Sequence, residues 1–244
     1  MAILYRSNAQ SRVLEESLIR AGLPYRIYGG QRFYERLEIR HALAYLRLLQ
    51  NPLDDAACDR VINVPPRGIG LKSVDLIRNL ARDEGCSLWQ AIEKTIEEKL
   101  LPPRALGSLS SFLALRENWL EQLKDAELDE VIDKVVKQSG LPDFFAKETS
   151  EKEQTRLENL QELVNAGSEF LSDDDSELSP LQQFLDSAAL DAGDGQADEF
   201  EDSVQLMTLH SAKGLEFRQV YLVGLEEGLF PHNMSLQEPG RLEE

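Results

Sequence analysis

Cysteine and histidine are scarce in this chain of 244 residues, which has two cysteines and three histidines. Cys58 and Cys86 are too few for a disulfide framework, and we expect them to be the reduced thiols of a cytoplasmic protein. The three histidines do not have the spacing of a zinc site. No apolar run approaches the ~20 residues that a membrane-spanning helix needs, and the first ten residues lack the pattern of a signal peptide. The composition therefore argues against disulfide-rich secreted, zinc-binding and membrane proteins, and no metal site is expected.

Acidic residues outnumber basic residues over the whole chain, but the ratio differs between its parts. The net charge of −18 argues against a protein that coats nucleic acid over its whole surface. Residues 1–80 nevertheless hold 12 basic side chains, 11 of them arginine, against 8 acidic ones. Residues 151–202 hold 16 acidic and 2 basic side chains. Such a chain can bind a polyanion at one place and repel it elsewhere.

The two ends of the chain have strand patterns, and the middle has helical ones. Strands are expected at 2–5, 25–28, 204–209 and 219–225, with a helix over 9–21 that Ser7 or Asn8 caps and Gly22 ends. The expected helices of the middle are 34–50, 54–63, 71–83, 87–99, 104–124, 128–139, 152–171 and 179–190. The pattern favours a mostly α protein, in which a helical domain is inserted into a partial α/β domain. A single mixed domain is the alternative.

A Gly-x-Gly turn lies between two of these helices, in the stretch "VPPRGIGLKSVDLI" at 64–77. Glycines at positions 68 and 70 free the backbone from Cβ crowding, so N–H groups at the start of the next helix can face an anion. Arg67 and Lys72 flank the turn, and Ile69 is expected to anchor it in the core. This is the pattern of a helix-hairpin-helix element that holds DNA phosphates without reading bases. A plain helix–helix turn remains the alternative.

A second polar turn follows a strand in "LMTLHSAKGLEF" at 206–217. Backbone N–H groups and the Lys213 ammonium could approach a phosphate there. Glu216 could accept a hydrogen bond from a sugar hydroxyl, and His210 could stack on a base or donate to a phosphate. By itself this pattern also fits an ordinary structural turn.

Arginines recur through the first third of the chain. Arg32, Arg36 and Arg40 are four residues apart and are expected to share one helix face. Arg26 and Arg47 extend the set, and an ordinary solvated face is the alternative interpretation.

Several stretches resemble one family in the same order. "LMTLHSAKGLEF" followed by "VYLVGLEEGLFP" resembles motif V of the UvrD/Rep/PcrA-type superfamily 1A DNA helicases, and "PPRGIG" resembles the GIG hairpin of their 2B domain. "AILYRSNAQSRVLEESL" and "PYRIYGGQRFYERLEIRHALAYLRLL" resemble their second RecA-like domain, 2A, and its exit into 2B. "EQTRLENLQELVNA" at 153–166 resembles a further 2B segment. The resemblance covers essentially the whole chain.

The resemblance implies three domain segments and an ATP-driven 3′→5′ DNA helicase that acts in repair. Residues 1–29 and 198–244 would belong to 2A, and residues 30–197 to 2B. The resemblance implies contacts to the nucleotide from Glu216, Lys213 and Gly214. It implies contacts to single-stranded DNA from Thr208, His210, Arg6 and Asn8, and to duplex DNA from Gly68, Ile69 and Gly70. Partners would be both forms of DNA, the remaining domains 1A, 1B and the rest of 2A, and possible repair proteins, with no membrane.

The chain lacks most of the apparatus for phosphoryl transfer. It has no G-x-x-x-x-G-K-[ST] motif and no acidic pair after an apolar strand. We therefore expect a part of a longer enzyme with no complete catalytic site and no ATPase activity of its own. ATP and Mg²⁺ would serve the full-length enzyme and would not bind this chain tightly. Two alternatives stay open: a non-catalytic DNA-binding module, and an acidic helical domain for protein interaction or autoinhibition.

Overall fold

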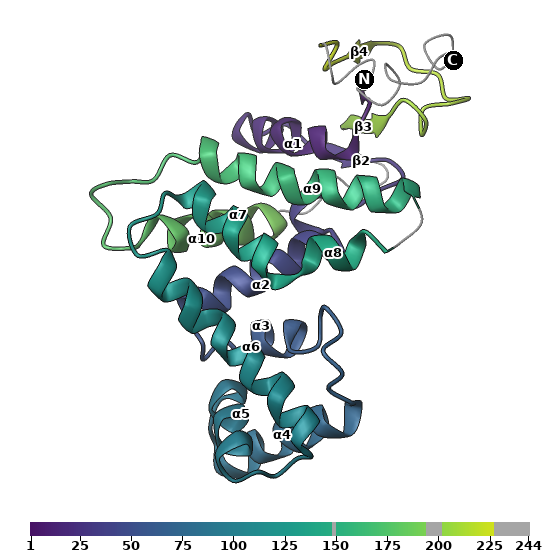
Figure 1. Ribbon diagram of the computed structural model, residues 1–244. Helices are drawn as coiled ribbons and strands as arrows, with labels where there is room; N and C mark the ends of the chain where they lie inside the picture. Colours follow the sequence, from purple (N-terminus) through teal and green to yellow (C-terminus); the bar gives the residue numbers. More distant parts are fainter. Residues whose placement is uncertain (148–149, 194–201, 227–244) are drawn as a thin grey trace. The chain divides into compact units, whose positions relative to one another are not determined.

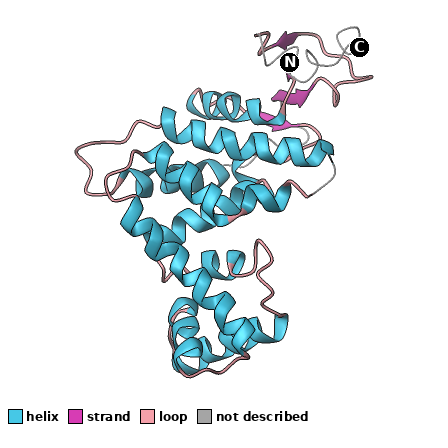
Figure 2. Cartoon of the chain, in the orientation of Figure 1, coloured by secondary structure: helices cyan, strands magenta, loops and turns pink. Residues whose placement is uncertain are grey.

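The computed structural model describes residues 1–147, 150–193 and 202–226 (Figure 1). The chain divides into two compact units. The sheet unit contains residues 1–36 together with the described residues from 188 onward, and the helical unit contains residues 37–187. Figure 2 shows that the strands belong to the sheet unit. No helix in the described ranges is long and apolar enough to span a membrane.

The described strands of the sheet unit form one parallel sheet. They are β1 (Ala2–Tyr5), β2 (Tyr25–Ile27), β3 (Val204–Thr208) and β4 (Val220–Leu222), in the order β2-β3-β1-β4. Ala2 pairs with Gln205 of β3 on one side and with Val220 of β4 on the other. The two ends of the chain therefore build a single sheet, with β1 between strands that lie some 200 residues away in sequence.

One helix supplies much of the apolar cover of this sheet. The 3-10 helix η1 (Asn8–Gln10) begins at Ser7, which forms a capping box with Gln10, and α1 (Ser11–Arg20) follows. Leu18 of α1 belongs to the core that the strands contribute to. The buried members of this core are Tyr5, Leu18, Tyr25, Ile27, Val204 and Leu206. A second 3-10 helix, η2 (Phe33–Glu35), precedes the helical unit.

The helical unit consists of α2 to α9 and most of α10. The bounds are α2 (Leu37–Gln50), α3 (Asp55–Val61), α4 (Leu71–Glu84), α5 (Leu88–Glu97), α6 (Pro103–Gln122), α7 (Leu128–Ser139), α8 (Leu141–Phe145), α9 (Ser150–Glu169) and α10 (Pro180–Gly193). Helices α2, α7 and α9 pack on one another, and α5 packs on α3, α4 and α6 (Figure 1). Two of the helices end where glycine permits a left-handed residue: Gly85 after α4 has φ +64° and Gly140 after α7 has φ +81°.

The structure confirms a mostly α protein with a small parallel sheet, and every expected helix and strand is present within a few residues of its predicted bounds. One helix was missed. The stretch "SGLPD" is predicted to be a turn, but the chain re-enters a helix at once, as α8. Leu141 and Phe145 are fully buried, so tertiary packing stabilises a helix too short to be evident from periodicity. Cys58 and Cys86 are both free.

The predicted arginine face does not form. Residues 33–35 make a 3-10 turn and Arg36 is extended, so the helix begins only at Leu37. Arg32 and Arg36 therefore precede the helix, and the spacing of four residues does not place them on one helix face with Arg40. Arg32 and Arg36 are instead buried in the sheet unit. Arg36 donates to Ser11 Oγ at 2.6 Å and lies 3.9 Å from Glu15, whereas Arg32 donates to the Tyr25 hydroxyl at 3.0 Å.

Candidate nucleic-acid interface

The chain reverses between α3 and α4 through residues 62–72, which we call the hairpin turn. One asparagine closes it. The backbone N–H of Arg67 donates to Asn63 Oδ1 at 2.8 Å, and Asn63 Nδ2 donates to the Ile69 carbonyl at 3.0 Å. Ile69 is 2% exposed, so it anchors the turn in the core as predicted. Gly68 has φ +74°, which explains why glycine is needed at this position.

The guanidinium of Arg67 points into the helical unit. Its Nη1 donates to the carbonyls of Val61 and Pro65 at 3.0 and 3.2 Å, and its Nη2 donates to the Tyr45 hydroxyl at 2.6 Å. The same group lies 5.1 Å from the centroid of the Phe112 ring. The sequence predicts that Arg67 flanks the turn with its charge. The structure shows that this charge is engaged with carbonyls and aromatic rings, so Arg67 braces the turn from within.

Two hydroxyl groups extend this brace. Ser108 of α6 donates through Oγ to the Arg67 carbonyl at 2.9 Å. The Tyr45 hydroxyl of α2 donates to the Val64 carbonyl, and burial raises the pKa of Tyr45 so that the hydroxyl keeps its proton. The hairpin turn is thus fixed by side chains of α2 and α6 together with its own Asn63 and Arg67, and its shape does not depend on a ligand.

The outer surface of the hairpin turn carries unused hydrogen-bond donors. Among the described residues, no acceptor is bonded to the backbone N–H groups of residues 68–72. Gly68, Gly70, Leu71 and Lys72 are on the surface, and Leu71 is 81% exposed. These N–H groups stand at the N-terminus of α4, where the helix dipole favours an anion.

Two exposed cations lie at this turn. Lys72 is in the first turn of α4 and makes no ion pair within the described ranges. Arg104 is exposed in the first turn of α6, and its Nη2 would lie 3.8 Å from a Cβ atom at position 68. Free N–H groups with two cations nearby are chemically suited to bind an anion such as a phosphate group.

A second group of predicted residues gathers where β1 and β3 end. We call residues 208–216 the strand-end turn. Tyr5 pairs in register with Thr208, so Arg6 follows β1 beside the start of this turn. Arg6 Nη1 lies 3.4 Å from His210 Nδ1, and the Thr208 and Ser211 hydroxyls are 2.9 Å apart. Parallel topology alone brings these polar groups to one edge, as it does in many α/β sites.

Most backbone N–H groups of the strand-end turn are already hydrogen-bonded. The N–H of Ser211 donates to Thr208 Oγ1, and those of Ala212, Lys213 and Leu215 donate to carbonyls within the turn. The sequence pattern suggests that these N–H groups could hold a phosphate. Within the described residues, the N–H groups of His210, Gly214 and Glu216 have no hydrogen-bond acceptor, so they and the exposed side chains are the groups that such a contact could use.

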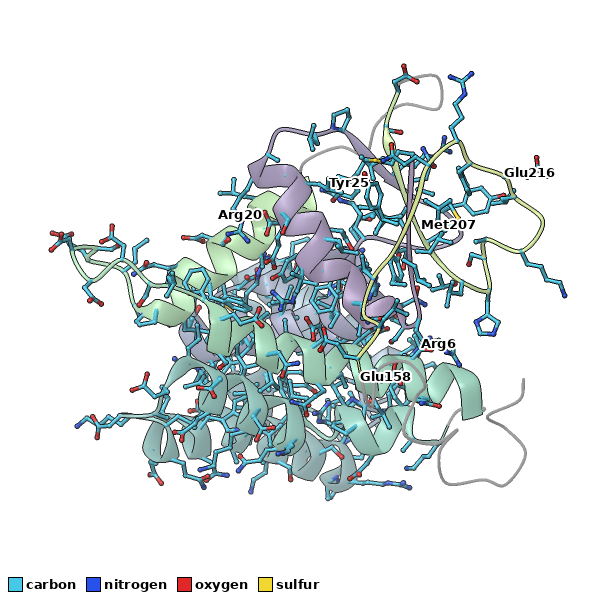
Figure 3. All side chains as sticks on the ribbon, turned by 90° about the horizontal axis from the view of Figure 1, so that it is seen from above. Arg6, Arg20, Tyr25, Glu158, Met207 and Glu216 are labelled. Atoms are coloured by element: carbon cyan, nitrogen blue, oxygen red, sulfur yellow. The ribbon has the colours of Figure 1, made fainter. Side chains whose placement is uncertain are left out.

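The predicted nucleotide contacts lie on the outer part of this turn. Lys213 and Glu216 are exposed, and Gly214 has φ +84° with open space around it. Figure 3 shows Glu216 on the loop beyond β3, well apart from Arg6. Asn8 is part-exposed at the start of η1, and its carbonyl accepts from Arg36 Nη1 at 2.9 Å. No group of side chains in the described ranges could hold a metal ion.

Three residues that form or border the hairpin turn were not predicted: Asn63, Tyr45 and Arg104. Asn63 lies in an apolar stretch without a turn signal, and Tyr45 has the pattern of an ordinary core position of a helix. Arg104 follows "LPP" at a helix start, 32 residues after Lys72. Arg104 lies at the hairpin turn only because α6 packs beside that turn.

The chain belongs to the family of the UvrD-like helicase C-terminal domain, whose model matches residues 1–244. The resemblance inferred from the motifs is therefore confirmed.

Named relatives are similar along the whole chain. DNA helicase II of Escherichia coli K12 is 56% identical over 244 residues, and DNA helicase II of Haemophilus influenzae is 51% identical over the same length. The ATP-dependent DNA helicase PcrA of Bacillus subtilis is 42% identical over 250 residues. The alignments cover 100% of this chain but only 34%, 34% and 33% of these relatives. The chain thus spans about a third of their length.

Proposed function

We propose that this chain is the part of an ATP-dependent 3′→5′ DNA helicase that holds duplex DNA through its helical unit. The observation that carries this proposal is the hairpin turn, whose free N–H groups lie beside Lys72 and Arg104 on a braced backbone. The names of the relatives support a helicase, and the family match supports the domain type. In this proposal the helical unit is the 2B domain and the sheet unit is part of the RecA-like domain 2A.

The remaining site residues take their roles within the longer enzyme. Arg6, Asn8, Thr208 and His210 would contact single-stranded DNA at the strand ends. Exposed carboxylate and ammonium groups at Glu216 and Lys213 fit a ribose hydroxyl and a phosphate at the edge of a nucleotide site, beside the backbone of Gly214. ATP, when bound, supplies the free energy for strand separation. These residues fit only part of an ATP site, because the described residues contain no cluster of Mg²⁺ ligands.

Duplex DNA binding by this chain tests the proposal. Lys72→Glu combined with Arg104→Glu should weaken binding at least about tenfold and reduce the slope of log K against log salt by about one for each lost phosphate contact. Arg82→Glu, at the other end of α4, is a single charge-reversal control, to be compared with Lys72→Glu alone, and should change neither quantity. Fluorescence anisotropy with a labelled duplex at several salt concentrations measures both.

The outcome also decides between the alternatives. A non-catalytic clamp binds DNA in this way but never acts within a motor, so a longer protein with helicase domains 1A and 1B must show unwinding that the double variant impairs. A protein-interaction or autoinhibitory domain binds no duplex at low salt, and wild type and variants then behave alike. Absence of duplex binding at low salt would refute the proposal that the hairpin turn holds duplex DNA.

ATP hydrolysis supplies an independent test. The chain has no P-loop sequence, so we expect its turnover of ATP to equal the background rate. A phosphate-release assay on the purified chain should show no difference from Glu216→Gln. Hydrolysis that Glu216→Gln abolished would contradict this expectation. Action in DNA repair, repair-protein partners and a cytoplasmic location in bacteria remain part of the proposal.

A further inference from the structure

Two of the predicted single-strand contacts, Arg6 and Asn8, lie on one short connection in the sheet unit. Residues 6–10, which we call the β1–α1 loop, join the end of β1 to the start of α1. Arg6 Nη1 lies 3.4 Å from His210 Nδ1. The side-chain amide and the backbone N–H of Asn8 have no partner within the described ranges. The loop therefore offers polar groups to a ligand, provided that its backbone holds one conformation.

A glutamine closes the β1–α1 loop from one side. Gln10 Oε1 accepts hydrogen bonds from the backbone N–H groups of Arg6 at 3.0 Å and Ser7 at 2.9 Å. A Cβ atom at position 224 would clash with Gln10 Nε2, so glycine at this position leaves room for the amide. Gln10 thereby fixes the backbone at the start of the loop, and the end of the loop at Asn8 needs another group.

Arg36, which follows Asn8 by 28 residues, holds this other side of the loop. Its Nη1 donates to the Asn8 carbonyl at 2.9 Å, and its Nη2 donates to Ser11 Oγ at 2.6 Å. Asn8 begins η1 and Ser11 begins α1, so one guanidinium connects the loop to the first residue of the helix. The planar guanidinium has both donors in a fixed geometry, which a lysine ammonium does not reproduce.

Surrounding groups hold the Arg36 side chain in place. Its Nε donates to the Gln31 carbonyl at 3.3 Å, and its guanidinium lies 5.3 Å from the centroid of the Phe33 ring. Glu15 lies 3.9 Å from Nη2 and accepts from Ser11 Oγ at 2.6 Å and from the Phe33 N–H at 3.2 Å. Arg36 is 7% exposed and Glu15 is 5% exposed. Buried pairs of this kind add little net stability, but they can select one conformation.

We propose that Arg36 is a positioning residue for the contact between the β1–α1 loop and single-stranded DNA. Its guanidinium holds Asn8 and Ser11, so that the Asn8 amide and the Arg6 side chain meet the strand in one arrangement. Because Arg36 is buried, it makes no phosphate contact of its own. The inference rests on the proposed single-strand contacts of Arg6 and Asn8, and it gives a role to an arginine that the sequence pattern places on a helix face.

Salt dependence separates positioning from direct contact. The probe is a fluorescein-labelled oligodeoxythymidine, and fluorescence anisotropy gives its affinity at several salt concentrations. Arg6→Gln should weaken binding and reduce the slope of log K against log salt by about 0.7, the value for one phosphate of a single strand. Arg36→Gln should weaken binding about tenfold through lost preorganisation, with the wild-type slope retained. A slope reduced as in Arg6→Gln would show direct contact and overturn the proposal.

Arg32→Gln is the matched control. It removes the same charge from a buried side chain four residues earlier, but Arg32 donates to the Tyr25 hydroxyl and the Ala192 carbonyl, which lie outside the loop. We expect this variant to bind the probe like the wild type even if it lowers the melting temperature. An equal loss of affinity in Arg32→Gln and Arg36→Gln would make Arg36 a general stabilising residue and overturn the proposal.

Two milder variants keep the test valid if Arg36→Gln does not fold, which circular dichroism melting reveals. Arg36→Lys retains the charge but cannot bridge the two acceptors, so it should also weaken probe binding. Ser11→Ala removes only the acceptor of Nη2 and should weaken binding about threefold, because the contact with the Asn8 carbonyl remains. Wild-type affinity in both variants would refute the positioning role.

The imidazole of His210 reports the position of Arg6 in the absence of DNA, because the two side chains are in contact. We expect Arg36→Gln to shift the ring signals of His210 in NMR spectra, as Arg6→Gln does, and Arg32→Gln to leave them in place. The variant His210→Gln identifies these signals. Unshifted His210 signals in Arg36→Gln would contradict the inference.

The inference and the proposed function fail in different ways. If Arg6→Gln weakens probe binding and Arg36→Gln does not, the inference is wrong and the single-strand contact stands. If Arg6→Gln and Asn8→Ala both leave probe binding unchanged, the proposed contact is wrong and Arg36 has no strand contact to position. Duplex binding through the hairpin turn should be the same in Arg36→Gln and wild type, because Arg36 belongs to the sheet unit.

Discussion

The hairpin turn and the strand-end turn each expose a lysine and at least one glycine, but they are built in different ways. The hairpin turn uses Asn63, Arg67 and Tyr45 to fix its shape from inside and leaves its outward N–H groups free. The strand-end turn uses its own N–H groups to close on itself and exposes long side chains. The first is preorganised for an anion, and the second offers side chains that further groups must complete.

The largest expected effect is that of Arg67→Met, because Arg67 fixes the hairpin turn from inside, whereas Lys72 lies on its outer surface. We expect Arg67→Met to lower the free energy of unfolding of the helical unit by about 2–4 kcal/mol, because buried carbonyls and the Tyr45 hydroxyl lose their partner. Lys72→Gln should leave that free energy within about 0.5 kcal/mol of wild type, because Lys72 is exposed. Urea denaturation followed by circular dichroism measures both. An Arg67→Met protein of wild-type stability would show that the brace is not needed.

The two histidines in the described ranges differ in exposure: His41 is buried in the helical unit, and His210 is exposed in the strand-end turn. Burial and the nearby Arg60, Arg156 and Arg40 lower the pKa of His41 to about 4, below its usual value of 6.5. Below pH 6.5 the unfolded chain therefore binds a proton that the folded chain does not, and this contribution to stability is lost as the pH falls from 6.5 to about 4.

The loss amounts to roughly 1–3 kcal/mol, given that the imidazole retains some solvent contact. Urea denaturation at pH 7 and pH 5 should show a smaller pH effect in His41→Gln than in wild type. His210→Gln, which changes the exposed histidine of the strand-end turn, is the control and should retain the wild-type effect. Equal pH effects in all three proteins would refute the role of His41.

The two glycines of the hairpin turn allow a matched comparison. Gly68 has φ +74°, so Gly68→Ala should destabilise the turn by about 1–2 kcal/mol. Gly70 has φ −70°, and a Cβ atom at this position would have no neighbour within 4 Å, so Gly70→Ala should be close to neutral. Thermal melting ranks the two variants. The prediction fails if Gly70→Ala is the more destabilising change.

The last prediction concerns the start of α5, a helix away from both turns. Ser87 and Gln90 form a capping box at α5, in which Ser87 Oγ accepts from the Gln90 N–H at 3.2 Å. Ser87→Ala should lower stability by about 1 kcal/mol and leave duplex DNA binding unchanged. A loss of DNA binding in this variant would mean that binding depends on the stability of the whole unit and not on the hairpin turn alone.

Much of the candidate site could be predicted from local sequence. Glycines at 68 and 70 between two helical patterns predict the hairpin turn, and the apolar Ile69 predicts its anchor. The direction in which the Arg67 side chain points was not predictable, because it depends on Tyr45 and Phe112 from other helices. The burial of Arg32 and Arg36 was missed for the same reason, since their partners come from α1 and β2.

The sequence by itself determined the strands, the helices other than α8, and the Gly-x-Gly turn, because these depend on residues within a few positions of one another. Tertiary structure alone decided the strand order β2-β3-β1-β4, the inward brace at Arg67 and the contacts of Arg36 with Asn8 and Ser11. Each of these joins residues far apart in the chain, and local propensity carries no information about which distant partners will meet.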